Sequence, residues 1–183
     1  MIASVMMLSP GCDKIKDATS RDFKVNNIKF DFSATTQADQ ATRSGEVADV
    51  ATRSGTTSFS VVRTVEIAEL GSDDAVKYAN KISNVEVAKT SISITTVPAG
   101  SFTVTNLKIT AAGVSGELFV PSYSIGSAFN APSNMNAYTE AFIKRLLDAK
   151  TVQVSVTGQS DAPAGTVINI SYQSDVVLTA SVL

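Results

Sequence analysis

The stretch TVQVSVTGQSDAPAGTVINISYQSDVVLTASVL, residues 151–183, alternates apolar and polar side chains more regularly than the rest of the chain. Apolar residues occupy every second position from Val152 to Val156 and again from Ile168 to Tyr172. This period of two is typical of strands with one buried face, and Pro and Gly in segment 158–165 indicate a loop between them. We expect three consecutive antiparallel strands here, with Asp175 introducing the third.

Working outward, the same period recurs upstream between turn residues such as Pro98 and Gly113. A phase slip near Asn106 predicts a β-bulge. The segment Asn134–Lys150 has an apolar stripe with helical spacing, and Ser72 with the two aspartates after it predicts the start of a shorter helix ending near residue 82. The further strands are predicted over 23–33, 58–70, 90–97, 102–110 and 114–125.

Seven or eight short strands with turns every 8–12 residues predict a mainly β fold. We expect an antiparallel β-sandwich, with immunoglobulin-like topology as the leading interpretation and one or two short helices. The 23 Ser and 21 Val residues among 183 agree with a sheet-rich domain, which would span 23–183. One core should contain the apolar residues Phe30, Phe32, Phe59, Ile94, Phe102, Leu118, Phe142, Val154, Ile170 and Leu178.

The segment 34–56 is polar, rich in small residues and without a hydrophobic period. It contains Ala-Thr-Arg-Ser-Gly twice, at 41–45 and at 51–55. Two copies are too few for a repeat architecture, so we expect a long exposed loop. Such loops are often functional, which makes Arg43 and Arg53 candidate binding residues.

Residues 1–11 carry no charge and include an apolar run that ends in Ser-Pro-Gly directly before Cys12, the single cysteine. Charged residues follow at once. The arrangement resembles the lipobox of bacterial lipoproteins, although Ser9 stands where that pattern prefers a large aliphatic residue. The resemblance implies a signal peptide over 1–11, lipidation of Cys12 and a tether over 12–22. No Lys or Arg precedes the apolar run, so we expect the signal peptide to begin upstream of Met1.

The alternative interpretation of Cys12 is a buried free thiol at the start of a cytosolic domain. A lipobox followed by a small Ser/Thr-rich sandwich is similar to small lipoproteins of the Bacteroidota. This resemblance implies an outer-membrane protein with its domain on the periplasmic or the surface side.

The composition excludes several kinds of chemistry. The chain has no His, no Trp and a net charge of −2, which argues against His-based catalysis, against metal sites built on His or Cys, and against nucleic-acid binding. No Gly-rich phosphate loop occurs, and no cofactor or metal is expected. We expect a non-enzymatic binding, adhesion or assembly module with a protein or glycan partner. The alternatives are an envelope hydrolase that uses carboxylates, and a subunit of a surface filament.

Overall fold

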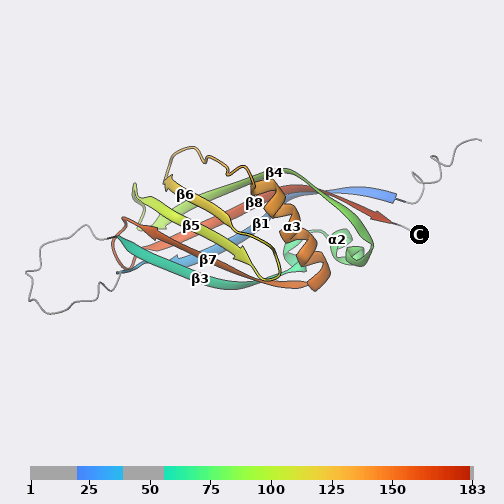
Figure 1. Cartoon of the computed structure of the whole chain (residues 1–183), viewed down its shortest axis with the longest axis horizontal. Coiled ribbons are helices and arrows are strands. Elements are labelled where there is room, and N and C mark those ends of the chain that lie inside the picture. The colour runs from blue at the N-terminus through green and yellow to red at the C-terminus, as the bar shows by residue number, and fades with distance from the viewer. Residues whose placement is uncertain (1–19, 39–55, 182–183) are drawn as a thin grey trace, which may run out of the picture.

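The computed structural model describes residues 20–38 and 56–181, which form two antiparallel sheets that face each other as in a β-sandwich (Figure 1). The mainly β fold is therefore confirmed. Sheet A has the order β1-β8-β4, with β1 (Ser20–Thr35), β8 (Val167–Ser181) and β4 (Ile82–Val97). Sheet B has the order β2-β3-β7-β5-β6, with β2 (Gln37–Ala38), β3 (Thr57–Glu66), β7 (Thr151–Ser160), β5 (Thr103–Ala111) and β6 (Leu118–Ser124).

The C-terminal region differs from the three strands expected there. Even-numbered side chains from Ile168 to Ala180 all point inward, including Ser174, so β8 continues through Asp175 without a turn. The Asp175 carboxylate instead accepts a hydrogen bond of 2.8 Å from the backbone N–H of Asn27, next to the bulge in β1. The expectation of consecutive pairing was also wrong, because β7 lies in sheet B and β8 in sheet A.

The strand order does not confirm an immunoglobulin-like topology, since β8 lies between β1 and β4 and none of these three strands are consecutive. The chain crosses from sheet A to sheet B at Thr36. The Thr36 hydroxyl donates to the carbonyl of Pro163 at 2.7 Å, and its backbone N–H donates to Thr166 at 2.8 Å. These bonds tie the crossing to the loop between β7 and β8.

The long helix α3 (Met135–Ala149) lies within one residue of its predicted ends. Ser72 caps α2 (Asp73–Lys77) by accepting from the N–H of Ala75 at 3.2 Å, as expected from the sequence. That helix is shorter than predicted, because a 3₁₀ turn follows it and β4 already begins at Ile82 rather than at residue 90. The 3₁₀ turns are η1 (Ile67–Leu70) and η2 (Ala79–Lys81).

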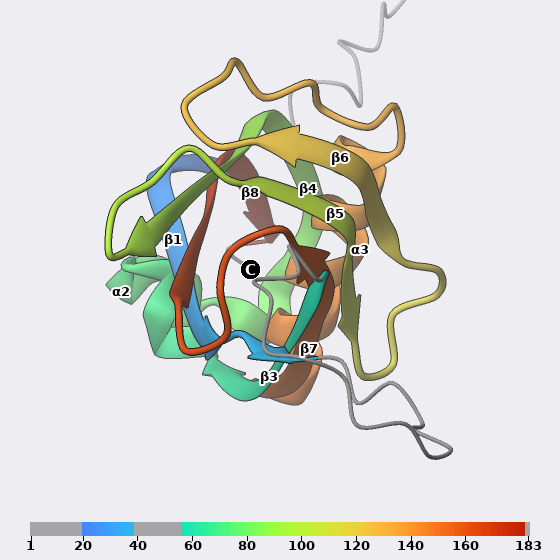
Figure 2. The same cartoon turned by 90° about the vertical axis from the view of Figure 1, so that its left-hand side faces the viewer.

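The core lies between the two sheets, which Figure 2 shows facing each other in the end-on view. At one end the strands of sheet A extend past those of sheet B (Figure 1), and α3 packs against β4 while the 3₁₀ turns pack against β1 and β8. Nine of the ten predicted core residues are buried. The exception is Phe102, which is half-buried and lies over Gly100.

The predicted ends of the tether and of the long loop also shift in the structure. β1 begins at Ser20, so the end of the expected tether is strand. β1 and β2 also take up residues 34–35 and 37–38 of the expected loop. Residues 39–55 lie outside the described part of the chain.

Candidate functional site

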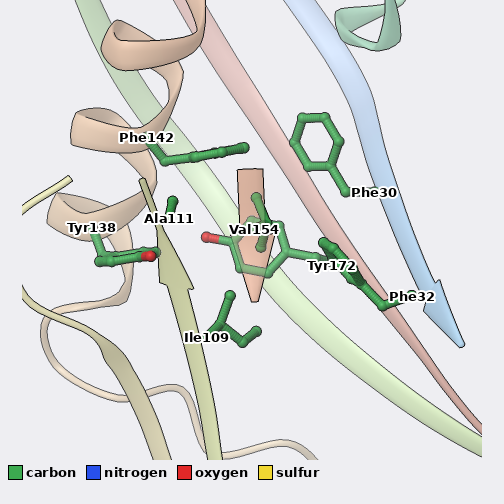
Figure 3. A pocket seen from close by; sticks show the side chains of 8 residues that line it. All are labelled: Phe30, Phe32, Ile109, Ala111, Tyr138, Phe142, Val154 and Tyr172. Carbon is green, nitrogen blue, oxygen red and sulfur yellow. The ribbon is translucent and has the colours of Figure 1, made fainter. Parts of the chain in front are cut away.

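A small apolar cavity lies where sheet A, sheet B and α3 meet (Figure 3). Its volume is about 20 Å³. A water molecule needs about 10–15 Å³ of such volume, and small-molecule pockets measure about 300–1,000 Å³. The cavity is therefore a packing gap with room for about one water. It is lined by Phe30, Phe32, Ile109, Ala111, Tyr138, Phe142, Val154 and Tyr172.

Hydroxyl groups connect α3 to sheet A beside this cavity. Thr139 Oγ1 contacts Tyr172 Oη and lies 3.2 Å from Thr90 Oγ1, which is itself 3.3 Å from Ser174 Oγ. Burial raises the pKa of the Tyr172 phenol and raises the pKa of Tyr138 to about 12. Both phenols therefore stay protonated near neutral pH and supply no base or nucleophile. The network's function is to position the helix on the sheet.

Arg63 joins the two sheets where β1 and β3 approach each other. Its Nη1 donates to the carbonyl of Asp31 at 3.2 Å, and its Nη2 pairs with the carboxylate of Glu69. The guanidinium carbon also lies 5.8 Å from the centroid of the Phe32 ring. These contacts account for a half-buried cation as a structural link between the sheets.

A shallow depression of about 440 Å³ lies on the outer face of sheet B, across β3, β7 and β5. Gly158 is in its floor, paired with Phe59 of β3. A Cβ atom at position 158 would lie 2.5 Å from the Phe59 ring, so the ring occupies the side-chain space of this residue. The large ring on the inner side requires a glycine opposite it.

The polar groups around this depression are mostly neutral. Asn106 Nδ2 donates to Gln159 Oε1 at 3.0 Å. Lys108, the charged member of the lining, lies 3.3 Å from the Glu117 carboxylate and 5.7 Å from the centroid of the Phe119 ring. Amides and hydroxyls around a single compensated cation suit a neutral, polar ligand better than a charged one. The remaining polar lining comes from Gln37, Ser58, Ser60 and Thr157.

A second depression, of about 460 Å³, lies on the outer face of sheet A. Its charged residues are Lys29 and Asp31, whose Nζ and Oδ2 atoms are 3.0 Å apart. Partial burial raises the pKa of Asp31, but the Ser171 hydroxyl and the Lys29 ammonium outweigh burial, and the pKa lies below its ordinary value. The carboxylate is therefore ionised and paired at neutral pH. The other polar side chains here are Ser33, Ser93, Thr95, Asn169 and Gln173.

The residues predicted as sites, Cys12, Arg43 and Arg53, lie outside the described ranges 20–38 and 56–181. Within those ranges, no group of three or more His, Cys, Asp or Glu side chains could hold a metal ion. No helix in the described part of the chain is long and apolar enough to cross a membrane.

Two aspartates, Asp161 and Asp175, bond to backbone N–H groups of neighbouring strands. Asp161 accepts from the N–H of Thr103 at 2.7 Å, and Asp175 accepts from that of Asn27 at 2.8 Å. Each carboxylate thus fixes a strand end or a bulge.

Sequence reasoning missed the residues of the outer depressions. The bulge near Asn106 was predicted and is present, since the register of β5 on β7 shifts between Thr105 and Lys108. Gln159 was predicted to lie in a loop over 158–165, whereas β7 continues to Ser160 and includes it. No sequence signal indicated that Gln37 lies beside these strands, because the contact depends on the crossing at Thr36.

No family model, curated protein or solved structure matches this chain.

Proposed function

We propose that this chain is a lipid-anchored protein of the cell envelope that acts as a non-enzymatic binding or assembly module. The observation that carries the proposal is a contrast between interior and surface. The interior cavity measures about 20 Å³, whereas the outer faces of the sheets carry depressions of about 440 and 460 Å³. Their linings of amides and hydroxyls favour contact with a glycan or a protein surface.

The anchor is supported by the apolar run before Cys12 and by the position of β1. Ser20 starts β1 and pairs with Ser181 at the end of β8. The eight residue steps from Cys12 to Ser20 span at most about 28 Å. An anchored chain would thus keep this end of sheet A near the membrane and present the opposite end, near Val97 and Val167, to its surroundings.

The proposal is tested by replacing Cys12 with Ala in cells that express the full chain. We expect the wild type in the membrane fraction with palmitate label, and the Cys12→Ala protein without label and released from the membrane. Ser9→Ala is the matched control, because it changes the same segment and keeps the thiol. Membrane-bound Cys12→Ala together with unlabelled wild type would refute the anchor.

The open edge of β4 supports an alternative function, that of a subunit of a surface filament. Over the described residues, β4 pairs with β8 alone, so its other edge is open. Open edges bind further strands, which favours a subunit of a surface assembly as the second candidate function.

A further inference from the structure

The outer edges of the two sheets differ in how they are protected against pairing with another chain. Natural edge strands are usually short, charged, bulged, interrupted by Pro or covered. β6 has only seven residues, with Pro121 in its middle. The edges of β1 and β3 lie against each other, and Arg63 of β3 donates to the Asp31 carbonyl of β1. Three edges therefore carry a recognisable protective feature.

The edge of β4 is protected over one half only. Residues 82–89 contain two register irregularities and two charged side chains, Glu86 and Lys89. Residues 90–97 read TSISITTV, with no charge, no Pro and no Gly, and they pair with β8 in regular register. Val97 is 59% exposed. This half of β4 has the composition of a strand that readily pairs with another.

We propose that residues 90–97 of β4 pair antiparallel with the same residues of a second copy. The two copies of sheet A then form one sheet of six strands, related by a two-fold axis. This inference rests on the proposed function, because it names a second copy of the chain as the partner of the assembly module.

Antiparallel self-pairing of residues 90–97 places apolar side chains opposite each other and brings no like charges together. In a register centred on Ser93, Ile92 of each copy lies opposite Ile94 of the other copy. Both side chains point to the inner face of their sheet. Thr90 lies opposite Thr96, whose buried hydroxyl has no hydrogen-bond partner among the described residues. Lys89 lies opposite the exposed Val97, where its alkyl stem covers apolar surface. No like charges meet.

The segment also lies where a second copy has access. Its register with β8 runs from Thr90 opposite Ser174 to Val97 opposite Val167, in the half of sheet A away from Ser20. The helix α3 meets β4 at Thr90, where Thr139 lies 3.2 Å away, at the border of this half. Ser93, Thr95 and Val97 are exposed, so the outer face of this half of β4 is accessible.

The test uses the full Cys12→Ala chain, which cannot carry a lipid at position 12, in sedimentation equilibrium over a concentration series. We expect a concentration-dependent dimer. Ser93→Lys places two ammonium groups opposite each other at the two-fold axis, and the dimer dissociation constant should rise about fivefold or more. Thr35→Lys is the matched control, because it adds the same charge on the same outer face at the opposite edge, on β1, and lies outside the lining of the depression. It should leave the dissociation constant unchanged.

A mixture identifies the register. Ser93→Glu should also weaken self-association, and an equimolar mixture of Ser93→Lys and Ser93→Glu should restore the dimer through opposite charges. A wild-type chain that stays monomeric throughout the series, or a dimer that Ser93→Lys and Thr35→Lys affect equally, would overturn the inference. In either case palmitate labelling at Cys12 would still decide the proposed function separately.

Discussion

Phe142 reaches from α3 towards the junction of the two sheets, where its ring packs edge-on against Phe30 with centroids 5.3 Å apart. Replacing it with Ala removes a buried ring and leaves a cavity, which should lower the free energy of unfolding by about 3–5 kcal/mol. The free energy of unfolding of a single domain is only about 5–15 kcal/mol, so the variant should unfold at a much lower urea concentration than the wild type.

The control for this prediction is Phe119→Ala, which removes the same ring from a position that is 37% exposed. We expect its urea midpoint to change much less. Equal midpoints for Phe142→Ala and the wild type would show that α3 contributes little to the core.

The buried phenols of Tyr138 and Tyr172 predict how stability depends on alkaline pH. Burial raises the pKa of both, to about 12 for Tyr138, so the folded chain keeps protons that the unfolded chain loses near pH 10. The two phenols therefore make their full contribution to the free energy of unfolding below about pH 10. That contribution is lost as pH rises through their pKa in the folded chain. Unfolding at pH 9 to 12 should show stability falling more steeply in the wild type than in Tyr172→Phe.

The slope with pH is the decisive quantity in that comparison. Tyr172→Phe also removes the contact with Thr139, which lowers stability at every pH without changing the slope. Parallel curves for the two proteins would contradict a raised pKa in the folded state.

At the scale of elements, Arg63 connects β3 to β1 and to η1. Arg63→Lys keeps the charge but cannot reach Asp31 and Glu69 with two fixed donors, and we expect a loss of about 1–2 kcal/mol in a chain that still folds. Lys29→Ala breaks an ion pair whose side chains are 50% and 61% exposed, and it should change stability by less than about 0.5 kcal/mol. Equal urea midpoints for these two variants would contradict the connecting role of Arg63.

The sequence predicted elements well where one periodicity continues without interruption. α3 follows its apolar stripe to within one residue at each end, and the bulge at Asn106 follows the phase slip beside it. Asp175 misled the prediction of β8, because a turn residue in sequence serves here as the partner of Asn27 on another strand. The start of β4 was missed because bulges disturb its alternation over 82–89.

At the scale of the whole molecule, sheet-rich composition and alternation predicted two facing sheets but not their strand order. The order depends on pairs far apart in the chain, such as Phe30 with Tyr172 and Val61 with Val156, and no local pattern specifies them. The outer depressions depend on the same strand pairings. From the sequence, their residues could therefore be predicted to lie on the surface of a sheet, but not to come together in one depression.

The open half of β4 is the feature of the whole molecule that sequence analysis could identify only in part. Residues 90–97 were predicted as a strand, and their lack of charge is visible in the sequence. Their place at an edge follows from β8 filling the centre of sheet A.

The most direct test of the account is the intact mass of the protein extracted from membranes. We expect the mass of a chain that begins at Cys12 and carries a lipid on that residue, with residues 1–11 removed by cleavage after Gly11. An unmodified chain that retains residues 1–11, recovered from the soluble fraction, would contradict the anchor and with it the assignment to the cell envelope.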